Sequence, residues 1–155
     1  MTKFSGNSQA KEKIKIKNYG LVSYAKSLKA MQEFTLNRKP NTADELWVLE
    51  HHKTYTLGVA SKPEHLPIKD TKINIYKSDR GGQITYHGPG QLIVYTLLDL
   101  KRRQTSIRSL IRILENSVIH ILKNHGVKAT GSESQPGVYV DDAKIASLGL
   151  RIKNG

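Results

Sequence analysis

Between residues 80 and 91 the chain reads RGGQITYHGPGQ, and glycine or proline occupies five of these twelve positions. Glycine adopts positive φ angles at little cost and proline restricts φ, so the backbone is expected to turn sharply on both sides of the centre. The central residues Ile84, Thr85 and Tyr86 are β-branched or aromatic, which is typical of a strand. The stretch predicts a short strand between two tight turns, whose exposed N–H groups could hold a phosphate or carbonyl oxygen.

Two side chains in this stretch can take part in chemistry. Arg80 places a permanent positive charge beside the first pair of glycines. The imidazole of His87 can take up or release a proton near neutral pH. Glycine-rich loops are often no more than tight turns, so the loop by itself leaves a binding role and a purely structural role open.

The remainder of the chain alternates between strand-like and helix-like segments. Apolar residues recur at helical spacing over 21–36 and again over 107–122, and Ser106 and Gly126 are expected to begin and end the second helix. Strands are expected at LWVLEH (46–51), TYTLGV (54–59), INIYKS (73–78), ITYHG (84–88) and LIVYTLLDL (92–100). This order predicts an α/β (α+β) fold, a mixed β-sheet with flanking helices.

The segment GVYVDDAKIASLGLRI, residues 137–152, predicts a β-hairpin that turns at Asp141 and Asp142. We expect its second strand to run on to Asn154 and Gly155. Alternate side chains of such a strand lie on opposite faces of the sheet.

If that strand is regular, Lys144 shares a face with the apolar residues Ala146, Leu148 and Leu150. A lysine held against an apolar face can lower the pKa of a neighbouring thiol or give up its own proton. The alternative is that the lysine side chain follows the turn and bends into solvent. Spacing alone supports both interpretations.

The charge of the chain points to an acidic partner. Lys and Arg number 25 against 13 Asp and Glu, which gives a formal net charge of +12 and a pI near 9.9. Nucleic acid, an anionic membrane and an acidic protein are all attracted to such a surface, and the lysines could equally be solvated and without a partner.

A length of 155 residues predicts one domain, with the polar residues 1–13 expected to be flexible. No apolar run is long enough for a membrane span, and the first residues do not resemble a secretory signal, so we expect a cytoplasmic location. The histidines other than His87 show no metal-ligand spacing and are not expected to form a cluster, and no metal site is predicted.

Three segments together resemble a known family, the lipoyl(octanoyl) transferases. They are SDRGGQITYHGPGQLIVYTLLDL (78–100), LWVLEHHKTYTLG (46–58) and PGVYVDDAKIASLGLRI (136–152), and the resemblance extends over residues 21–155. It implies the fold of the biotin and lipoate protein ligases and an enzyme that uses no cofactor. That enzyme would move an octanoyl group from octanoyl-acyl carrier protein to a lysine of a lipoyl domain. The implied acceptors are the lipoyl domains of 2-oxoacid dehydrogenase complexes and the glycine cleavage H protein, with no nucleic acid or membrane partner.

The resemblance also implies roles for particular residues. Lys144 matches the family's catalytic lysine. The substrate-binding residues implied are Arg80, Gly81, Gly82, Gln83, Ile84, Thr85, Tyr86 and His87 on one side of the acyl site, and Ser147, Leu148 and Gly149 on the other.

The family's mechanism passes through a thioester on a cysteine, and this chain contains no cysteine. In the family the cysteine follows the strand that here reads SLGLR. We therefore expect the chain to be a C-terminally shortened form of the enzyme. Ser147 is the nearest hydroxyl, but the resemblance assigns its segment to substrate binding.

Three other functions remain open from the sequence. An ATP-dependent lipoate or biotin ligase would share the fold and need no cysteine, but lipoate ligases typically read Tyr-His-Asp where this chain has Tyr86-His87-Gly88. A basic nucleic-acid-binding domain would account for the charge, although no recognised binding motif is present. An inactive acyl-binding domain is the third.

Overall fold

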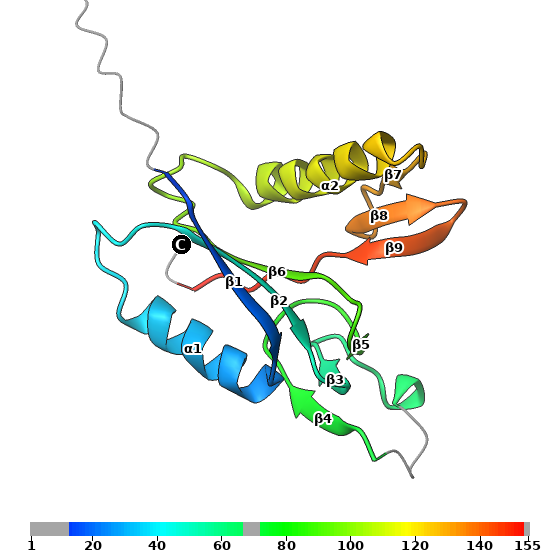
Figure 1. Ribbon diagram of the computed structural model, residues 1–155, viewed down its shortest axis with the longest axis horizontal. Coiled ribbons are helices and arrows are strands. Elements are labelled where there is room, and N and C mark those ends of the chain that lie inside the picture. Colours follow the sequence, from blue (N-terminus) through cyan, green and yellow to red (C-terminus); the bar gives the residue numbers. More distant parts are fainter. Residues whose placement is uncertain (1–12, 67–71, 154–155) are drawn as a thin grey trace, which may run out of the picture. The chain divides into compact units, whose positions relative to one another are not determined.

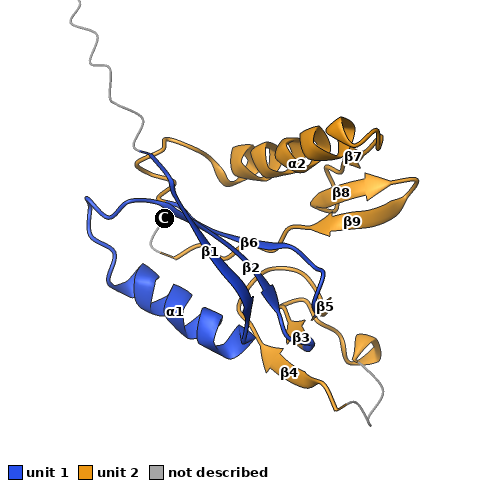
Figure 2. Ribbon diagram, in the orientation of Figure 1, with its two compact units in different colours: residues 1–54, 87–98 blue, residues 55–86, 99–155 orange. Residues whose placement is uncertain are grey.

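The computed structural model of the chain describes residues 13–66 and 72–153 (Figure 1). Apart from Lys13, the segment expected to be flexible lies outside the described residues. The structure separates into two compact units, one within residues 1–54 and 87–98 and the other within 55–86 and 99–155 (Figure 2). The expectation of a single domain stays a prediction.

The first unit contains a three-stranded sheet in the order β1-β2-β6, formed by β1 (Lys15–Val22), β2 (Glu45–His51) and β6 (Ile93–Leu97). β1 pairs with β2 in parallel, and β2 pairs with β6 antiparallel. The sheet is therefore mixed, as predicted. Strand β1 was not expected, because most of its side chains are exposed and it is defined by backbone pairing with β2 rather than by an apolar pattern.

Helix α1 (Tyr24–Leu36) begins later than the predicted helix, because Leu21 and Val22 pair with β2 as the end of β1. Tyr24 is buried at the start of the helix, and Phe34 lies edge-on to Trp47 of β2 with ring centroids 6.0 Å apart. Aromatic pairs of this geometry favour a fixed packing angle. The apolar stripe thus holds the helix on the sheet, although Ala25, an apolar residue within the predicted range, is exposed.

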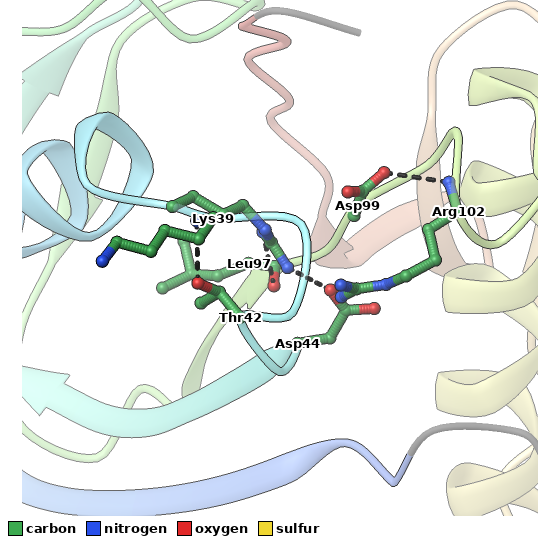
Figure 3. Close-up of polar contacts among 7 residues, drawn as sticks. Lys39, Thr42, Asp44, Leu97, Asp99 and Arg102 are labelled. Atoms are coloured by element: carbon green, nitrogen blue, oxygen red, sulfur yellow. Dashed lines mark hydrogen bonds and ion pairs between the residues drawn. The ribbon is translucent and has the colours of Figure 1, made fainter.

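The loop between α1 and β2 is held by polar contacts within the first unit (Figure 3). Arg38 donates to the carbonyl oxygen of Leu97 at 3.3 Å and pairs with the buried carboxylate of Asp44. The backbone N–H of Lys39 donates to Thr42 Oγ1 at 2.8 Å. These contacts fix the loop that leads into the start of β2.

A second sheet has the order β4-β3-β5, formed by β3 (Thr54–Leu57), β4 (Asn74–Lys77) and β5 (Thr85–His87). Except for Thr54 and His87, these residues belong to the second unit, as does the 3₁₀ helix η1 (Pro63–His65). The strands expected around residues 54–59, 73–78 and 84–88 are confirmed, each with shorter bounds.

Helix α2 (Ile107–Asn124) and the third sheet complete the second unit. The sheet has the order β7-β8-β9 and consists of β7 (Thr130–Gly131), β8 (Gly137–Val140) and β9 (Ala143–Ser147). Helix α2 contacts β7 and β8.

The predicted ends of α2 are confirmed. Ser106 is the N-cap, where its hydroxyl accepts from the N–H of Ser109 at 3.1 Å. Gly126 follows the helix with a φ of +75°, the left-handed conformation that glycine adopts readily. The predicted apolar stripe is buried only in part: Leu110 is buried, while Ile107 and Ile121 are 46% and 56% exposed.

The hairpin turn at Asp141 and Asp142 is also confirmed, with φ angles of 47° and 64°. Two successive positive φ angles are typical of the turns whose twist matches that of paired strands. The predicted length of the second strand is wrong, because β9 ends at Ser147. The following residues instead pack against the loop at Arg80. Asn154 and Gly155 lie outside the described residues.

Candidate active site

Arg80 is the centre of a hydrogen-bonded cluster in the second unit. Its Nη2 donates to the carbonyl oxygen of Thr56 at 3.0 Å, to Thr56 Oγ1 at 2.8 Å and to Thr85 Oγ1 at 3.0 Å. Its Nη1 donates to the carbonyl oxygen of Gly81 at 2.9 Å. The planar guanidinium group holds β3, β5 and the glycine loop together, and a point charge such as an ammonium group could not reach all four oxygens.

Glycines around this cluster leave room for the arginine. A methyl group at Gly58 would lie 2.2 Å from the carbonyl oxygen of Gly82 and 2.8 Å from Arg80 Nη1. Gly82 itself has a φ of +84°, a backbone conformation that residues with a side chain rarely adopt. A methyl group at Gly149 would lie 3.0 Å from Arg80 Cδ. Glycine at positions 58 and 149 therefore has a steric reason, and glycine at position 82 has a conformational one.

The segments placed by the resemblance on two sides of an acyl site contact each other. The N–H of Gly81 donates to the carbonyl oxygen of Leu150 at 2.9 Å, and Gly149 lies against the side chain of Arg80. Leu148 is half-buried between Ser147 and Gly149, which are both exposed. The structure thus brings the loop at 80–82 and the residues after β9 together, and their role in substrate binding stays a prediction.

The other predicted residues of the loop differ in their surroundings. The amide oxygen of Gln83 bonds to His65 Nδ1 at the protein surface, and Ile84 is half-buried. Tyr86 is 42% exposed, with its ring centroid 5.3 Å from that of Tyr55. Of these three residues, Gln83 and Tyr86 are exposed and Ile84 is not.

His87 lies in the first unit, where it belongs to an aromatic cluster that the sequence did not indicate. Its ring is stacked on that of Tyr24, and its centroid is 5.9 Å from that of His51. His87 Nδ1 also bonds to the side-chain oxygen of Gln91 at 2.7 Å. Of the remaining histidines, His51 thus contacts His87, a contact that the sequence analysis did not predict.

His51 is fully buried at the end of β2. Its Nδ1 donates to the carbonyl oxygen of Val22 at 3.0 Å, so its Nε2 accepts from the hydroxyl of Tyr95 at 2.8 Å. Burial lowers the pKa of His51 below its ordinary value. The hydrogen bond to the carbonyl group of Val22 raises this pKa by a smaller amount, and the neighbouring His52 lowers it slightly further. The burial of His51 could have been predicted from the sequence. Alternate residues of a strand share a face, and this places His51 on the same face of β2 as the buried Trp47.

Lys144 lies on the other face from the one predicted, because β9 is irregular. Tyr139 pairs with Lys144 and Val138 pairs with Ala146, so Ile145 is an extra residue between them. Neighbouring residues of β8 point to opposite faces, and paired residues share a face. Lys144 is therefore on the opposite face from Ala146.

The side chain of Lys144 is exposed and runs along β8. A methyl group at Gly137 would lie 3.0 Å from Lys144 Cε and 3.3 Å from Cδ, so the alkyl chain covers that glycine. The ammonium group lies 3.5 Å from the carbonyl oxygen of Pro136 and 5.1 Å from the centre of the Tyr139 ring. The latter distance suits a cation–π contact.

This position brings the ammonium group of Lys144 to the open end of the hairpin. Gly137 is paired with Ser147, the last residue of β9. The amine therefore lies at the level where the chain leaves β9 for Leu148 and Gly149. Within the second unit, the catalytic residue implied by the resemblance is next to one of the two implied substrate-binding segments.

Two further findings concern the described residues, 13–66 and 72–153. They contain no group of three or more histidine, aspartate or glutamate side chains arranged to hold a metal ion. None of their helices has the length and apolar character needed to cross a membrane.

Residues 23–155 match the family model of the lipoyl protein ligase A/B catalytic domain. An octanoyltransferase of Neisseria meningitidis is 56% identical over 142 residues, which are 92% of this chain and 68% of that protein. An octanoyltransferase of Azoarcus sp. is 54% identical over 140 residues, 90% of this chain and 62% of that protein. The chain thus spans about two thirds of the length of these relatives.

Solved structures agree on the fold. The crystal structure of lipoate-protein ligase A bound with ATP has a TM-score of 0.62 and 18% identity, over 81% of this chain and 53% of that one. A bipartite lipoate protein ligase from Thermoplasma acidophilum also has a TM-score of 0.62 at 18% identity, over 82% of this chain and 51% of that one. At such identities the likeness establishes the architecture alone.

The chain therefore belongs to the family of lipoyl protein ligase A/B catalytic domains. Within that family it belongs with the octanoyltransferases, which are acyltransferase enzymes. The predicted fold class, family and enzyme class are confirmed.

Proposed function

We propose that this chain supplies the catalytic lysine and much of the acyl-binding surface of an enzyme that transfers octanoyl groups to lipoyl domains. The observation that carries the proposal is the position of Lys144, whose amine lies at the level of Ser147 where the chain leaves β9. The segment that follows contacts the loop of Arg80 and Gly81. The identity of 54–56% to octanoyltransferases supports the same conclusion.

The proposed reaction is an exchange of acyl bonds. A thiolate attacks the thioester of the octanoyl donor and releases the donor thiol. The amine of the acceptor lysine then attacks the new thioester, whose carbon–sulfur bond breaks, so that an amide forms and the nucleophilic thiol is released. Lys144 would favour the thiolate form of the nucleophile and then take part in proton transfer as the amine attacks. These 155 residues contain no cysteine, so they do not themselves provide that thiol.

The substrate-binding roles proposed for the two segments follow from their chemistry. The loop from Arg80 to His87 and the residues Ser147, Leu148 and Gly149 combine small residues and exposed backbone with half-buried apolar side chains. Small residues let an acyl chain approach the backbone closely, and backbone N–H groups can stabilise the oxyanion of each tetrahedral intermediate. The donor arrives as an activated thioester, so no nucleotide or other cofactor is required.

The proposed donor is octanoyl-acyl carrier protein, and the proposed acceptors are lipoyl domains of 2-oxoacid dehydrogenase complexes and the glycine cleavage H protein. These proteins are typically acidic, and the formal net charge of +12 would speed encounter with them at low ionic strength. A cytoplasmic location is proposed with them, because the donor and acceptors occur there.

The test uses the protein isolated from its own source, incubated with octanoyl-acyl carrier protein and a lipoyl domain. We expect intact-mass measurement to show octanoylation of the lipoyl domain and an octanoyl adduct on the enzyme. The variant K144A should form both products at a strongly reduced but measurable rate, whereas K128A, at an exposed lysine after α2, should form them at the parent rate. Transfer that requires free octanoate and ATP would identify a ligase and overturn the proposal, as would no transfer under either condition.

A further inference from the structure

Helix α2 buries a carboxylate on the side that faces the third sheet. Glu115 is 6% exposed and, among the described residues, has no ion-pair partner. Its Oε1 accepts a hydrogen bond from the backbone N–H of Gly137 at 2.8 Å. Removing a carboxylate from water is costly and is rarely retained for packing alone. The hydrogen bond to Gly137 is therefore expected to have a role beyond packing.

The strands beside α2 are shaped to receive this carboxylate. A methyl group at Gly131 of β7 would lie 3.0 Å from Glu115 Oε2. A methyl group at Gly137 of β8 would lie 2.7 Å from the carbonyl oxygen of Ala146. Glycine at both positions leaves space for the carboxylate at β7 and for close pairing of β8 with β9.

Glu115 and Lys144 contact the same peptide group from its two ends. The group joins Pro136 to Gly137: its N–H donates to Glu115, and its carbonyl oxygen faces the ammonium group of Lys144 at 3.5 Å. The N–H and C=O of a trans peptide point in opposite directions, so the two charged side chains lie on opposite sides of the peptide. A carboxylate that accepts from the N–H polarises the peptide and makes its oxygen a better acceptor.

The geometry points to Glu115 as a positioning residue for Lys144. Its carboxylate fixes the orientation of the peptide between Pro136 and Gly137, and thereby both surfaces that Lys144 contacts. One is the carbonyl oxygen beside the ammonium group, and the other is the α-carbon of Gly137 beneath the alkyl chain. The inference rests on the proposed catalytic role of Lys144 and adds a second residue, on a different element, to that function.

The first experiment measures the position of Lys144 without any acyl substrate. The protein is labelled with a limiting amount of an N-hydroxysuccinimide ester, and mass spectrometry compares labelling at Lys144 with that at the exposed Lys128. Hydrogen exchange at the amide of Gly137 is followed in parallel. The variants are E115Q, which keeps an oxygen acceptor, E115L, which removes it, and E133L, a control at an exposed glutamate of the same unit.

In E115L we expect exchange at Gly137 to become about tenfold faster, the factor for loss of one hydrogen bond of ordinary net strength. Labelling of Lys144 relative to Lys128 should rise several-fold, because the amine leaves its contacts. E115Q and E133L should match the parent protein. An unchanged labelling ratio in folded E115L would overturn the inference. If E115L does not fold, E115D, which keeps the charge but withdraws the acceptor by one carbon, replaces it with the same criteria.

The second experiment tests whether Glu115 acts through Lys144 in octanoyl transfer. E115L should lower kcat with little change in the KM for the acceptor, and E115Q should restore it. In the K144A background, E115L should produce no further loss, because the residue that it positions is already absent. Equal losses in both backgrounds would indicate a merely structural role and overturn the inference. Absence of transfer in the parent protein would refute the proposed function, while the labelling result would still decide the positioning role.

Discussion

The guanidinium group of Arg80 donates to both the carbonyl and the hydroxyl oxygen of Thr56, a residue with no exposed surface. The charge that the sequence places beside two glycines is thus used inside the second unit, where it joins strands to a loop. The glycines leave the loop free to bend around the arginine. Any substrate held by this loop would meet a backbone whose shape depends on a half-buried cation.

Replacing Arg80 by lysine should destabilise the protein. Lysine keeps the charge but cannot reach the oxygens of Thr56, Thr85 and Gly81 together. We expect a loss of about 2 kcal/mol in the free energy of unfolding, because buried acceptors are left unsatisfied. Urea denaturation of R80K measures it, with R108K at an exposed position of α2 as the control. Equal midpoints for the two variants would contradict the scaffolding role.

Two glycine substitutions in the same unit should differ sharply. The added methyl group of G58A would lie 2.2 Å from the carbonyl oxygen of Gly82, whereas that of G81A would come no closer than 3.7 Å to Leu150. Overpacking of this kind costs about 1–3 kcal/mol, so G58A should lower the thermal midpoint while G81A remains near the parent value. If G58A proved as stable as G81A, the close approach of these backbones would be refuted.

The buried His51 should make stability depend on pH. Burial lowers its pKa, so the folded protein binds this proton less readily than the unfolded chain. Its contribution to stability is present above the ordinary histidine pKa of 6.5 and is lost as the pH falls towards the lowered folded-state value.

The measurement is the thermal midpoint between about pH 7.5 and pH 5, a range that spans the ordinary histidine pKa. The parent protein should lose stability across it. H51Q, which can still bond to Val22 and Tyr95, should lose less, and H120Q at an exposed site of α2 should behave like the parent. A profile for H51Q parallel to that of H120Q would argue against His51 as the source.

The N-cap of α2 should contribute measurably to stability. S106A removes the hydroxyl that accepts from the N–H of Ser109 and should cost about 1 kcal/mol. S117A is the matched control, because the exposed hydroxyl of Ser117 only donates back to the carbonyl oxygen of Ile113 within the helix. Chemical denaturation compares them, and a loss in S117A equal to that in S106A would exclude a specific capping effect.

Local features of this protein could be predicted from its sequence because they depend on neighbours in the chain. The cap at Ser106, the helix end at Gly126 and the turn at Asp141 and Asp142 each follow from the conformational preferences of a few adjacent residues. The motif between residues 80 and 91 identified the family for the same reason, since its residues are contiguous. The mixed sheet followed from the order of strands and helices.

Other features were decided by pairing between distant segments. Strand β1 is mostly exposed and is defined by its backbone pairing with β2. Its residues therefore do not alternate between buried and exposed, which is the pattern by which a strand is predicted. The face of Lys144 depends on the extra residue Ile145, which only the register with β8 reveals. After β9 ends at Ser147, the chain forms a hydrogen bond between Leu150 and the distant Gly81. A sequence specifies preferences along the chain, whereas register and contact are settled by which distant backbone groups satisfy each other's hydrogen bonds.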